Sequence, residues 1–341
     1  MAHGSRPDML VQASVGGVRD FLHAGAALNP HPKIITVLMN STAGSVNGAH
    51  DAATKVTAAF AGHGAEAKIQ ELPGDGIAAA VREFVQRRTA SATDDAEALA
   101  VAGGDGTISA AVGVLAGTGV PLGLLPMGTL NHFAKDLGLP LELDAAAGIV
   151  AAGRTRKVDV AELNGRVFVN NSSVGLYPFM VERRDAHQHR NRVGKMLATI
   201  PATIEALRGA SWHRLDIAAA GERQSLRTPC IFVGNNAYGR DLKTLGSRAR
   251  LDGGELDIRV VRQQSRLGVL LLPFKIALGI VDPEHDVQTF RSVDLEIVSR
   301  RRRSLRVALD GEVVRMETPL RYRSKPGALS VFCGPPSTPP P

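Results

Sequence analysis

Apolar and polar positions follow each other along the first half of the chain in blocks that predict an α/β fold. Short apolar runs predict strands at residues 34–39, 67–72, 98–102 and 122–125. Apolar positions at helical spacing predict helices near residues 48–62, 76–88, 107–117, 130–136 and 144–152. Because strands that are separated by helices pair through crossover connections, we expect a parallel sheet covered by helices.

The pattern changes near Gly153, where we expect a domain boundary. After it, strand-like runs follow one another at residues 158–163, 167–170, 214–219, 231–235, 256–261, 293–298, 305–309 and 320–323. Asn164-Gly165 and Asp310-Gly311 are hairpin signals between such runs. The predicted organisation is a loosely ordered leader (1–32), an α/β domain (33–153), a β-rich domain (154–327) and a disordered tail (334–341), with a last strand near 328–333 that could return to the first domain.

Three glycines surround a single carboxylate at the end of the predicted strand 98–102. Gly103, Gly104 and Gly106 flank Asp105 where a strand passes into a helix, a position at which backbone N–H groups can face an anion. Glycines let a polyphosphate approach the backbone and permit positive φ. A carboxylate beside phosphates is repelled unless it binds Mg²⁺ or accepts a proton from an attacking hydroxyl. The alternative is an ordinary exposed turn.

A second glycine turn follows the next predicted strand. Residues 126–131 read Pro-Met-Gly-Thr-Leu-Asn, and again a helix pattern begins directly afterwards. Since the carboxyl ends of neighbouring parallel strands meet at one edge of a sheet, we expect both turns to contribute to one ligand site.

Together with Asp310-Gly311-Glu312, these two turns resemble the diacylglycerol kinase catalytic-domain family, which includes bacterial lipid kinases, sphingosine kinases and ceramide kinases. The resemblance covers about residues 33 to 333. It implies a nucleotide-binding α/β domain followed by an antiparallel β-sandwich that holds the lipid. It also implies ATP and Mg²⁺ as cofactors, and transfer of the γ-phosphoryl group to the hydroxyl of a membrane lipid such as diacylglycerol.

The resemblance assigns roles to particular residues. Those expected at the nucleotide are Asn40, Gly103, Gly104, Asp105, Gly106, Thr107, Ile108, Ser109, Gly128, Thr129 and Asn131. The expected catalytic residues are Asp105, Asp310 and Glu312, and both Asp105 and Glu312 stay open as the base that accepts the hydroxyl proton. Because alternate residues of a strand share a face, Asp310 and Glu312 are expected to point together into the cleft between the domains.

Two departures from the family pattern bear on cations. Asn40 is followed by Ser-Thr-Ala-Gly, and no Lys or Arg occurs in the loop from Asn40 to Ala49, so a phosphate-steering cation is missing there. The family's Asp-Asp-Gly element, which holds a structural Mg²⁺ in some bacterial members, reads Asp252-Gly253-Gly254. Asp252 is therefore the remaining candidate for such a metal.

Charge divides the chain in two. Residues 1–179 carry 13 basic against 16 acidic side chains, whereas residues 180–341 carry 27 against 17. An anionic membrane surface is the partner we expect for this basic part, at Arg183, Arg184, Arg190, Arg192 and Lys195. For Arg300–Arg303 a solvated face is the alternative. Nucleic acid is not an expected partner, because only three Tyr and one Trp are available for stacking and no DNA-binding motif occurs.

Location and function class complete the expectations. Cys230 and Cys333 are the only cysteines, which favours a reducing compartment. The apolar segment 267–281 contains Pro273 and Lys275 and falls short of the roughly 20 residues that span a bilayer. We expect a cytoplasmic enzyme, peripheral at the inner face of the membrane, and a homodimer is compatible with the sequence. A small-molecule kinase resembling NAD kinases and a catalytically weak lipid-binding regulatory protein stay open as alternatives.

Overall fold

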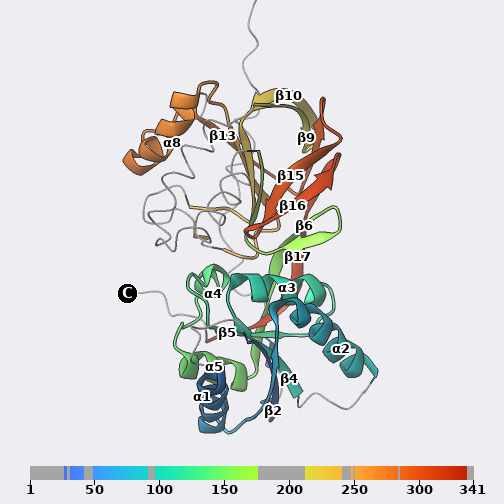
Figure 1. The fold of residues 1–341 in the computed structure, drawn as a ribbon, viewed down its shortest axis with the longest axis vertical. Helices are drawn as coiled ribbons and strands as arrows, with labels where there is room; N and C mark the ends of the chain where they lie inside the picture. The colour runs from blue at the N-terminus through green and yellow to red at the C-terminus, as the bar shows by residue number, and fades with distance from the viewer. Residues whose placement is uncertain are drawn as a thin grey trace, which may run out of the picture.

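The computed structural model describes residues 27–28, 31–41, 49–90, 97–175, 212–239, 247–248, 250–282 and 285–335. In Figure 1 an α/β body lies below a body built mainly of strands, and strands β6 and β17 connect the two. The expected fold class, a parallel α/β domain followed by an antiparallel sandwich, is confirmed.

The α/β body is a parallel sheet between two layers of helices. Its strands β2 (Ile34–Asn40), β3 (Glu66–Leu72), β4 (Glu97–Gly103) and β5 (Leu122–Pro126) pair in parallel in the order β3-β2-β4-β5. The helices are α1 (Ala49–Gly62), α2 (Ile77–Ala90), α3 (Asp105–Leu115), α4 (His132–Asp136) and α5 (Leu143–Ala151), preceded in the case of α2 by the short 3₁₀ turn η2 (Gly74–Gly76).

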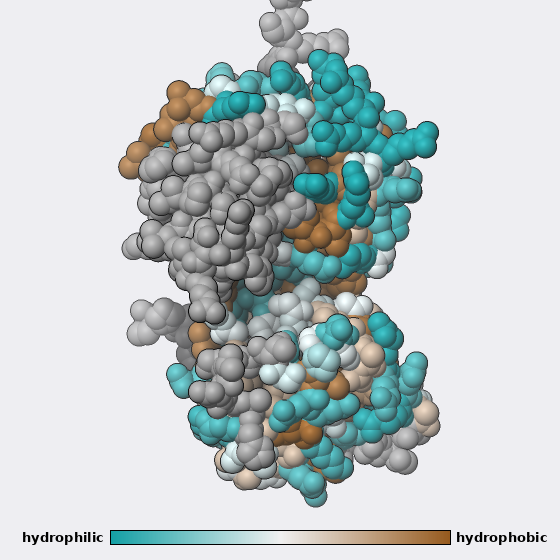
Figure 2. Space-filling view, viewed as in Figure 1, coloured by the Kyte–Doolittle hydropathy of each residue, from teal (hydrophilic) through white to brown (hydrophobic). Residues whose placement is uncertain are grey.

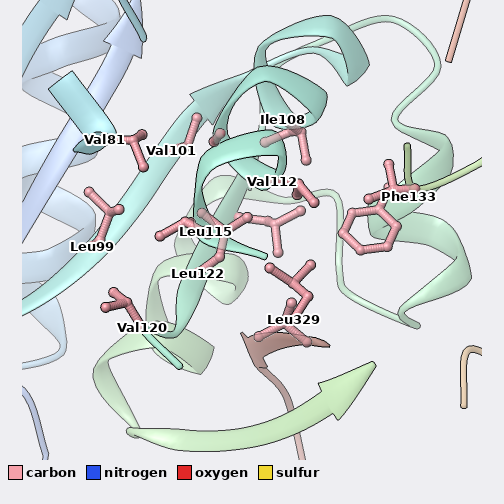
Figure 3. Close-up of a cluster of buried hydrophobic side chains, with 14 of the residues drawn as sticks. Val81, Leu99, Val101, Ile108, Val112, Leu115, Val120, Leu122, Phe133 and Leu329 are labelled. Carbon is pink, nitrogen blue, oxygen red and sulfur yellow. The ribbon is translucent and has the colours of Figure 1, made fainter. Parts of the chain in front are cut away.

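Alternation along the strands places these helices on opposite faces. Ile35 and Val37 of β2 pack with buried side chains of α1 and α5, whereas Leu38 packs with those of α2 and α3. Figure 3 shows the second of these cores, where Ile108, Val112 and Leu115 of α3 lie over the sheet. Helix α3 is thereby fixed on the sheet, and so is the glycine turn from which it begins.

The second body consists of two antiparallel layers. One layer pairs in the order β13-β12-β11-β8-β15-β16. Its strands are β8 (Asn171–Gly175), β11 (Cys230–Asn235), β12 (Leu256–Val261), β13 (Val287–Ser292), β15 (Ser304–Leu309) and β16 (Glu312–Glu317). The other contains β6 (Arg154–Leu163), β7 (Arg166–Phe168), β9 (His213–Ala219), β10 (Glu222–Thr228), β14 (Asp294–Ser299) and part of β17 (Leu320–Phe332). Their inward side chains form one core, with Tyr322 fully buried in it. Helix α8 (Arg266–Leu278) lies at the edge of this body.

Strand β17 belongs to both bodies. Its beginning pairs with β14 and β6, and at its end Val331 pairs in parallel with Leu122 of β5. The sequence had suggested two separate strands because Pro326-Gly327 interrupts the apolar pattern. The structure accommodates this interruption as an irregularity between Lys325 and Leu329 within one continuous strand. The two-residue strand β1 (Ala27–Leu28) also pairs with β6.

Sequence patterns missed the strands β1, β8, β10, β13 and β16. Strand β10 reads Glu-Arg-Gln-Ser-Leu-Arg-Thr and lies at the edge of its sheet. One face of such a strand is exposed to solvent, so it needs few apolar residues and gives a weak strand pattern. The expected hairpins at Asn164-Gly165 and Asp310-Gly311 both form. Strand β6 begins at Arg154, next to the expected boundary, although the domain limits themselves stay predictions. Within the described residues, every helix is too short or too polar to cross a membrane.

Candidate active site

The two glycine turns lie against each other at the carboxyl edge of the parallel sheet. Met127 N donates a hydrogen bond to Gly103 O (3.1 Å). The backbones of Gly104 and Gly128 come so close that a Cβ added to Gly128 would lie 2.5 Å from the Cα of Gly104. The structure therefore brings together the two turns that the sequence assigned to one site.

Close approach, rather than unusual backbone angles, accounts for these glycines. Gly103, Gly104, Gly106 and Gly128 are not among the described residues with positive φ, so the interpretation that they supply such angles is wrong. A Cβ on Gly103 would lie 2.7 Å from the side chain of Thr107. Gly106, in contrast, has no atom within 4 Å of an added Cβ and is exposed.

Asn131 adopts the positive φ that the glycines do not. Its φ is 50°, and its side chain closes the turn on itself: Gly128 N donates to Asn131 Oδ1 (3.0 Å), and Asn131 Nδ2 donates to Gly128 O (2.9 Å). Because Asn131 is buried, its side chain shapes the turn from within. Thr129 is exposed next to it and is the residue of this turn best placed to meet a ligand.

Asn40 and Thr107 support the first turn in a similar way. Asn40, at the end of β2, donates from Nδ2 to Thr107 Oγ1 (2.9 Å). Thr107 is buried, and Ile108 belongs to the core beneath α3. These residues therefore hold the glycine turn in place, whereas the half-buried Gly104 and Asp105 and the exposed Gly106 form its open side.

Asp105 is the first residue of α3 and faces the second turn. Its Oδ1 accepts a hydrogen bond of 3.4 Å from Phe133 N, in the first turn of α4. The carboxylate thus lies between the segments 103–107 and 128–133.

Asp310 joins the second body to this region. The residue occupies the hairpin turn with φ 46°, and its carboxylate accepts hydrogen bonds from the backbone N–H groups of Val169, Asn170 and Asn171 at 2.8–3.1 Å. It also accepts one from Ser109 Oγ of α3 (2.8 Å). Burial raises the pKa of Asp310 above its usual range, and these four hydrogen bonds oppose that rise by stabilising the anion.

Glu312 lies in a different environment two residues away. Its side chain is largely exposed and pairs with Arg166 of β7 (Nη2–Oε2 3.0 Å). Strand alternation does not relate the two acids, because β15 ends at Leu309 and Asp310 lies in the turn. The expectation that both carboxylates share one orientation in the cleft does not match these contacts.

A buried ion pair between the bodies was missed by the sequence analysis. Arg248, only 4% exposed, donates from Nε to Asp136 Oδ2 (2.8 Å) at the end of α4. Its other nitrogens donate to Asn170 Oδ1 (2.9 Å) and to the backbone oxygens of Asn235 and Val169. Nothing in the polar stretch around Arg248 distinguishes a buried arginine from an exposed one, so no sequence signal could have identified it.

The contacts of Asp252 do not fit a structural metal. Its carboxylate is half-exposed and accepts a hydrogen bond from Arg250 Nε (3.0 Å). The neighbouring N–H groups of Gly253 and Gly254 donate to Asn236 Oδ1 (2.8 Å) and Asp159 Oδ2 (2.7 Å). Over the described part of the chain, no three His, Cys, Asp or Glu side chains gather as metal ligands. The basic cluster expected to face a membrane, residues 183–195, lies outside the described residues.

A parallel α/β domain with paired glycine turns, joined by a shared strand to an antiparallel sandwich, defines a diacylglycerol-kinase-like fold. Comparison with known families agrees. Residues 34–163 match the diacylglycerol kinase catalytic domain, and residues 180–333 match the YegS C-terminal NAD kinase beta sandwich-like domain. The chain therefore belongs to the diacylglycerol kinase catalytic-domain family.

Individual relatives support this assignment. The chain is 30% identical over 312 residues to a diacylglycerol kinase of Mycobacterium tuberculosis, covering 87% of this chain and 94% of that protein. It is 28% identical over 258 residues to a protein of Synechocystis sp., covering 74% of this chain and 59% of the relative's length. A crystal structure from Bacillus anthracis str. Sterne superposes with a TM-score of 0.69 at 24% identity, over 90% of this chain and 99% of the other, and supports the fold.

Proposed function

We propose that this protein transfers the γ-phosphoryl group of ATP to the hydroxyl of a membrane lipid, diacylglycerol or a close relative of it. The observation that carries the proposal is the contact between the two Gly-Thr turns with Asp105 between them, in a chain of the diacylglycerol kinase catalytic-domain family. The reaction would take place at the inner face of the membrane, with the protein bound peripherally.

In this mechanism the glycine turns position the nucleotide. Gly104 and Gly106 present backbone that no side chain covers, so the phosphates can approach it closely, and Thr129 meets the nucleotide from the second turn. Mg²⁺ would neutralise phosphate charge during transfer, and Asp105 is the carboxylate best placed to hold it. Asn40, Thr107 and Asn131 keep the turns in their observed shape.

The transfer itself needs an acceptor for one proton. The oxygen of the lipid hydroxyl forms a bond to the γ-phosphorus, the bond from that phosphorus to the β–γ bridging oxygen breaks, and ADP leaves. The hydroxyl proton passes to a carboxylate, for which Asp105 and Glu312 are the two candidates. Asp310 already accepts four hydrogen bonds, so its role in this proposal is to position the second body against α3.

The decisive experiment is a phosphoryl-transfer assay with labelled ATP and a panel of acceptors: diacylglycerol, ceramide, a sphingoid base and NAD. Transfer to a lipid and not to NAD supports the proposal. Transfer to NAD alone would favour the NAD-kinase-like alternative, which the description of the matching C-terminal domain keeps open. Binding of lipid without any transfer, under conditions where ATP binds, would indicate the regulatory alternative.

Variants then separate the two candidate bases. Asp105→Asn keeps the size of the side chain and removes its charge, and we expect about a hundredfold or greater loss of transfer with folding intact. Glu312→Gln removes the second carboxylate. If Glu312 is the base, Glu312→Gln should lose about as much phosphoryl-transfer activity as Asp105→Asn. If Glu312 acts only through its surface charge, the transfer rate should change by about threefold or less.

A further inference from the structure

Exposed apolar side chains gather on helix α8. Among the described residues, four exposed large hydrophobic side chains lie on α8 or directly after it: Leu267, Leu271, Leu278 and Ile280. Two of them, Leu267 and Leu278, are 64% and 71% exposed. In Figure 2 this helix is the brown projection at the upper left edge of the molecule.

The three leucines form a stripe along one side of the helix. At 100° per residue, positions 267, 271 and 278 fall within a sector of about 40°. Leu272, in contrast, is buried against the body. An apolar stripe on the outer side of a helix that also has a buried side indicates a contact outside the chain.

An ion pair between the half-buried Lys275 and a buried carboxylate attaches the helix to the body. Lys275 Nζ donates to both carboxylate oxygens of Asp286 (2.8 and 2.9 Å). The Asp286 side chain is fully buried and also accepts hydrogen bonds from Gln263 and from the backbone N–H of Asp282. At 100° per residue, Lys275 lies about 40° from Leu271 around the helix, so this ion pair anchors α8 beside the leucine stripe and leaves the leucines exposed.

Basic residues lie on α8 and just before it, whereas acidic residues follow the helix at Asp282, Glu284 and Asp286. From residue 262 to residue 281 the chain carries Arg262, Arg266 and Lys275 and no acidic residue. Helices that lie in the interface of a bilayer combine an apolar side with basic residues that meet anionic headgroups. Because Lys275 is already paired with Asp286, Arg262 and Arg266 are the basic residues that would meet the headgroups beside the leucine stripe.

The size of the stripe argues against a second copy of this chain. A helix of 13 residues is about 20 Å long and covers an area of about 200 Å² at a width of about 10 Å. Stable protein interfaces bury about 800 Å² on each partner. A bilayer requires no matching shape and accepts a small apolar projection.

We propose that α8 is a docking element for an anionic lipid bilayer, and that Leu267, Leu271, Leu278 and Ile280 enter the boundary between headgroups and acyl chains. The proposal rests on the proposed function for its choice of partner, and it adds to that function the element by which the protein reaches its substrate. It is independent of the basic cluster at residues 183–195.

The test uses the full-length protein and vesicles with and without phosphatidylglycerol in a phosphatidylcholine background. The variant Leu267→Gln/Leu271→Gln/Leu278→Gln replaces the stripe with a good helix former at exposed positions. We expect its partitioning onto anionic vesicles, measured by co-sedimentation, to fall about tenfold or more. Val293→Gln is the matched control, because Val293 is 63% exposed between β13 and β14, away from α8, and this variant should bind within about twofold of the parent. Equal binding of the triple variant and the parent overturns the proposal.

A second variant reports insertion directly. Leu271→Trp adds one indole to a chain whose only tryptophan is Trp212. With brominated phosphatidylglycerol in the vesicles, we expect this indole to be quenched and its emission to shift to the blue relative to the parent. Absence of additional quenching on vesicles that bind the protein overturns the proposal, also in the event that the triple variant does not fold.

Two further measurements separate this proposal from the others. Analytical ultracentrifugation without lipid would overturn it if the parent were a dimer and the triple variant a monomer. Phosphorylation of a short-chain, water-soluble diacylglycerol needs no docking, and we expect the triple variant to retain it. If the parent phosphorylates no lipid while the triple variant still loses vesicle binding, the proposed function fails and the docking role stands. If the parent phosphorylates lipid and the triple variant binds vesicles as well as the parent does, the docking role fails and the proposed function stands.

Discussion

The second body has two ends that are built differently. At the end facing the α/β body, Asp310 accepts hydrogen bonds from backbone groups and from the half-buried Ser109, and Arg248 donates to backbone oxygens and to the buried Asp136. At the outer end, ion pairs such as that of Arg300 with Asp216 are exposed, and α8 presents leucines to solvent. Strand β17 runs from the outer end at Leu320 to the α/β body at Phe332 and so connects the two regions.

The difference shows where this protein requires a fixed geometry. Exposed ion pairs contribute little to stability, whereas one charge left alone in a buried pair is strongly destabilising. The inner end therefore holds the acidic hairpin and the glycine turns in one relative position. We expect the outer end to tolerate substitution better than the inner end.

The largest effect is expected from the buried pair that joins the two bodies. Arg248→Met leaves Asp136, whose side chain is 7% exposed, without its cationic partner, and should lower the free energy of unfolding by about 3–5 kcal/mol. Arg250→Met is the matched control, since it removes an exposed pair with Asp252 two residues away and should change stability by at most about 0.5 kcal/mol. Denaturant unfolding of both variants measures the contrast. Equal losses would mean that burial does not distinguish these pairs.

A smaller effect is expected from the two glycine turns. In Gly128→Ala the new Cβ meets the Gly104 backbone at 2.5 Å, and we expect a loss of about 1–3 kcal/mol of stability. In Gly104→Ala the nearest atom lies 3.4 Å away, an ordinary contact, so stability should change little. If Gly104 faces the phosphates, this variant should instead weaken ATP binding, measured by calorimetry. Unchanged ATP affinity with unchanged stability would remove Gly104 from the nucleotide site.

The two acids of the hairpin provide the next contrast. Asp310→Asn cannot accept all four hydrogen bonds as an anion does, and it should lose about 1–3 kcal/mol of stability. Glu312→Gln breaks only the exposed pair with Arg166 and should be neutral within about 0.5 kcal/mol. Thermal unfolding of the two variants tests this directly. A large stability loss in Glu312→Gln would show that the exposed pair supports the fold.

Local sequence patterns predicted the parallel sheet, its helices and both hairpins, because burial of one face imposes a period on the chain. They also located the residues of the glycine turns. At Gly103 and Gly128 a Cβ would overlap neighbouring atoms, so only glycine fits there. They failed where a role depends on distant partners. Asn131 resembles a ligand-binding amide in the sequence but closes its own turn, and Arg248 resembles any surface arginine until Asp136 and Asn170 enclose it.

The smallest effect is expected at the outer end, from the pair of Asp216 and Arg300. Hydrogen bonds from Arg300 and from Ser225 hold the pKa of Asp216 below its usual value of 3.8. A carboxyl group whose pKa is lower in the folded state stabilises the protein above the unfolded pKa, and this contribution is lost as the pH falls through the folded value. The stability deficit of Arg300→Gln should therefore be present at pH 7 and shrink below about pH 4.

Salt provides a second control on the same pair. Because Asp216 and Arg300 are exposed, the deficit of Arg300→Gln should also shrink between 0.1 M and 1 M salt, where the Debye length falls from about 10 Å to about 3 Å. NMR titration of Asp216 in the parent and the variant measures the pKa directly, and its value should return toward 3.8 in Arg300→Gln. A deficit independent of both pH and salt would show that Arg300 acts through packing of its aliphatic stem rather than through charge, and the outer end would then resemble the inner end more closely than its exposure suggests.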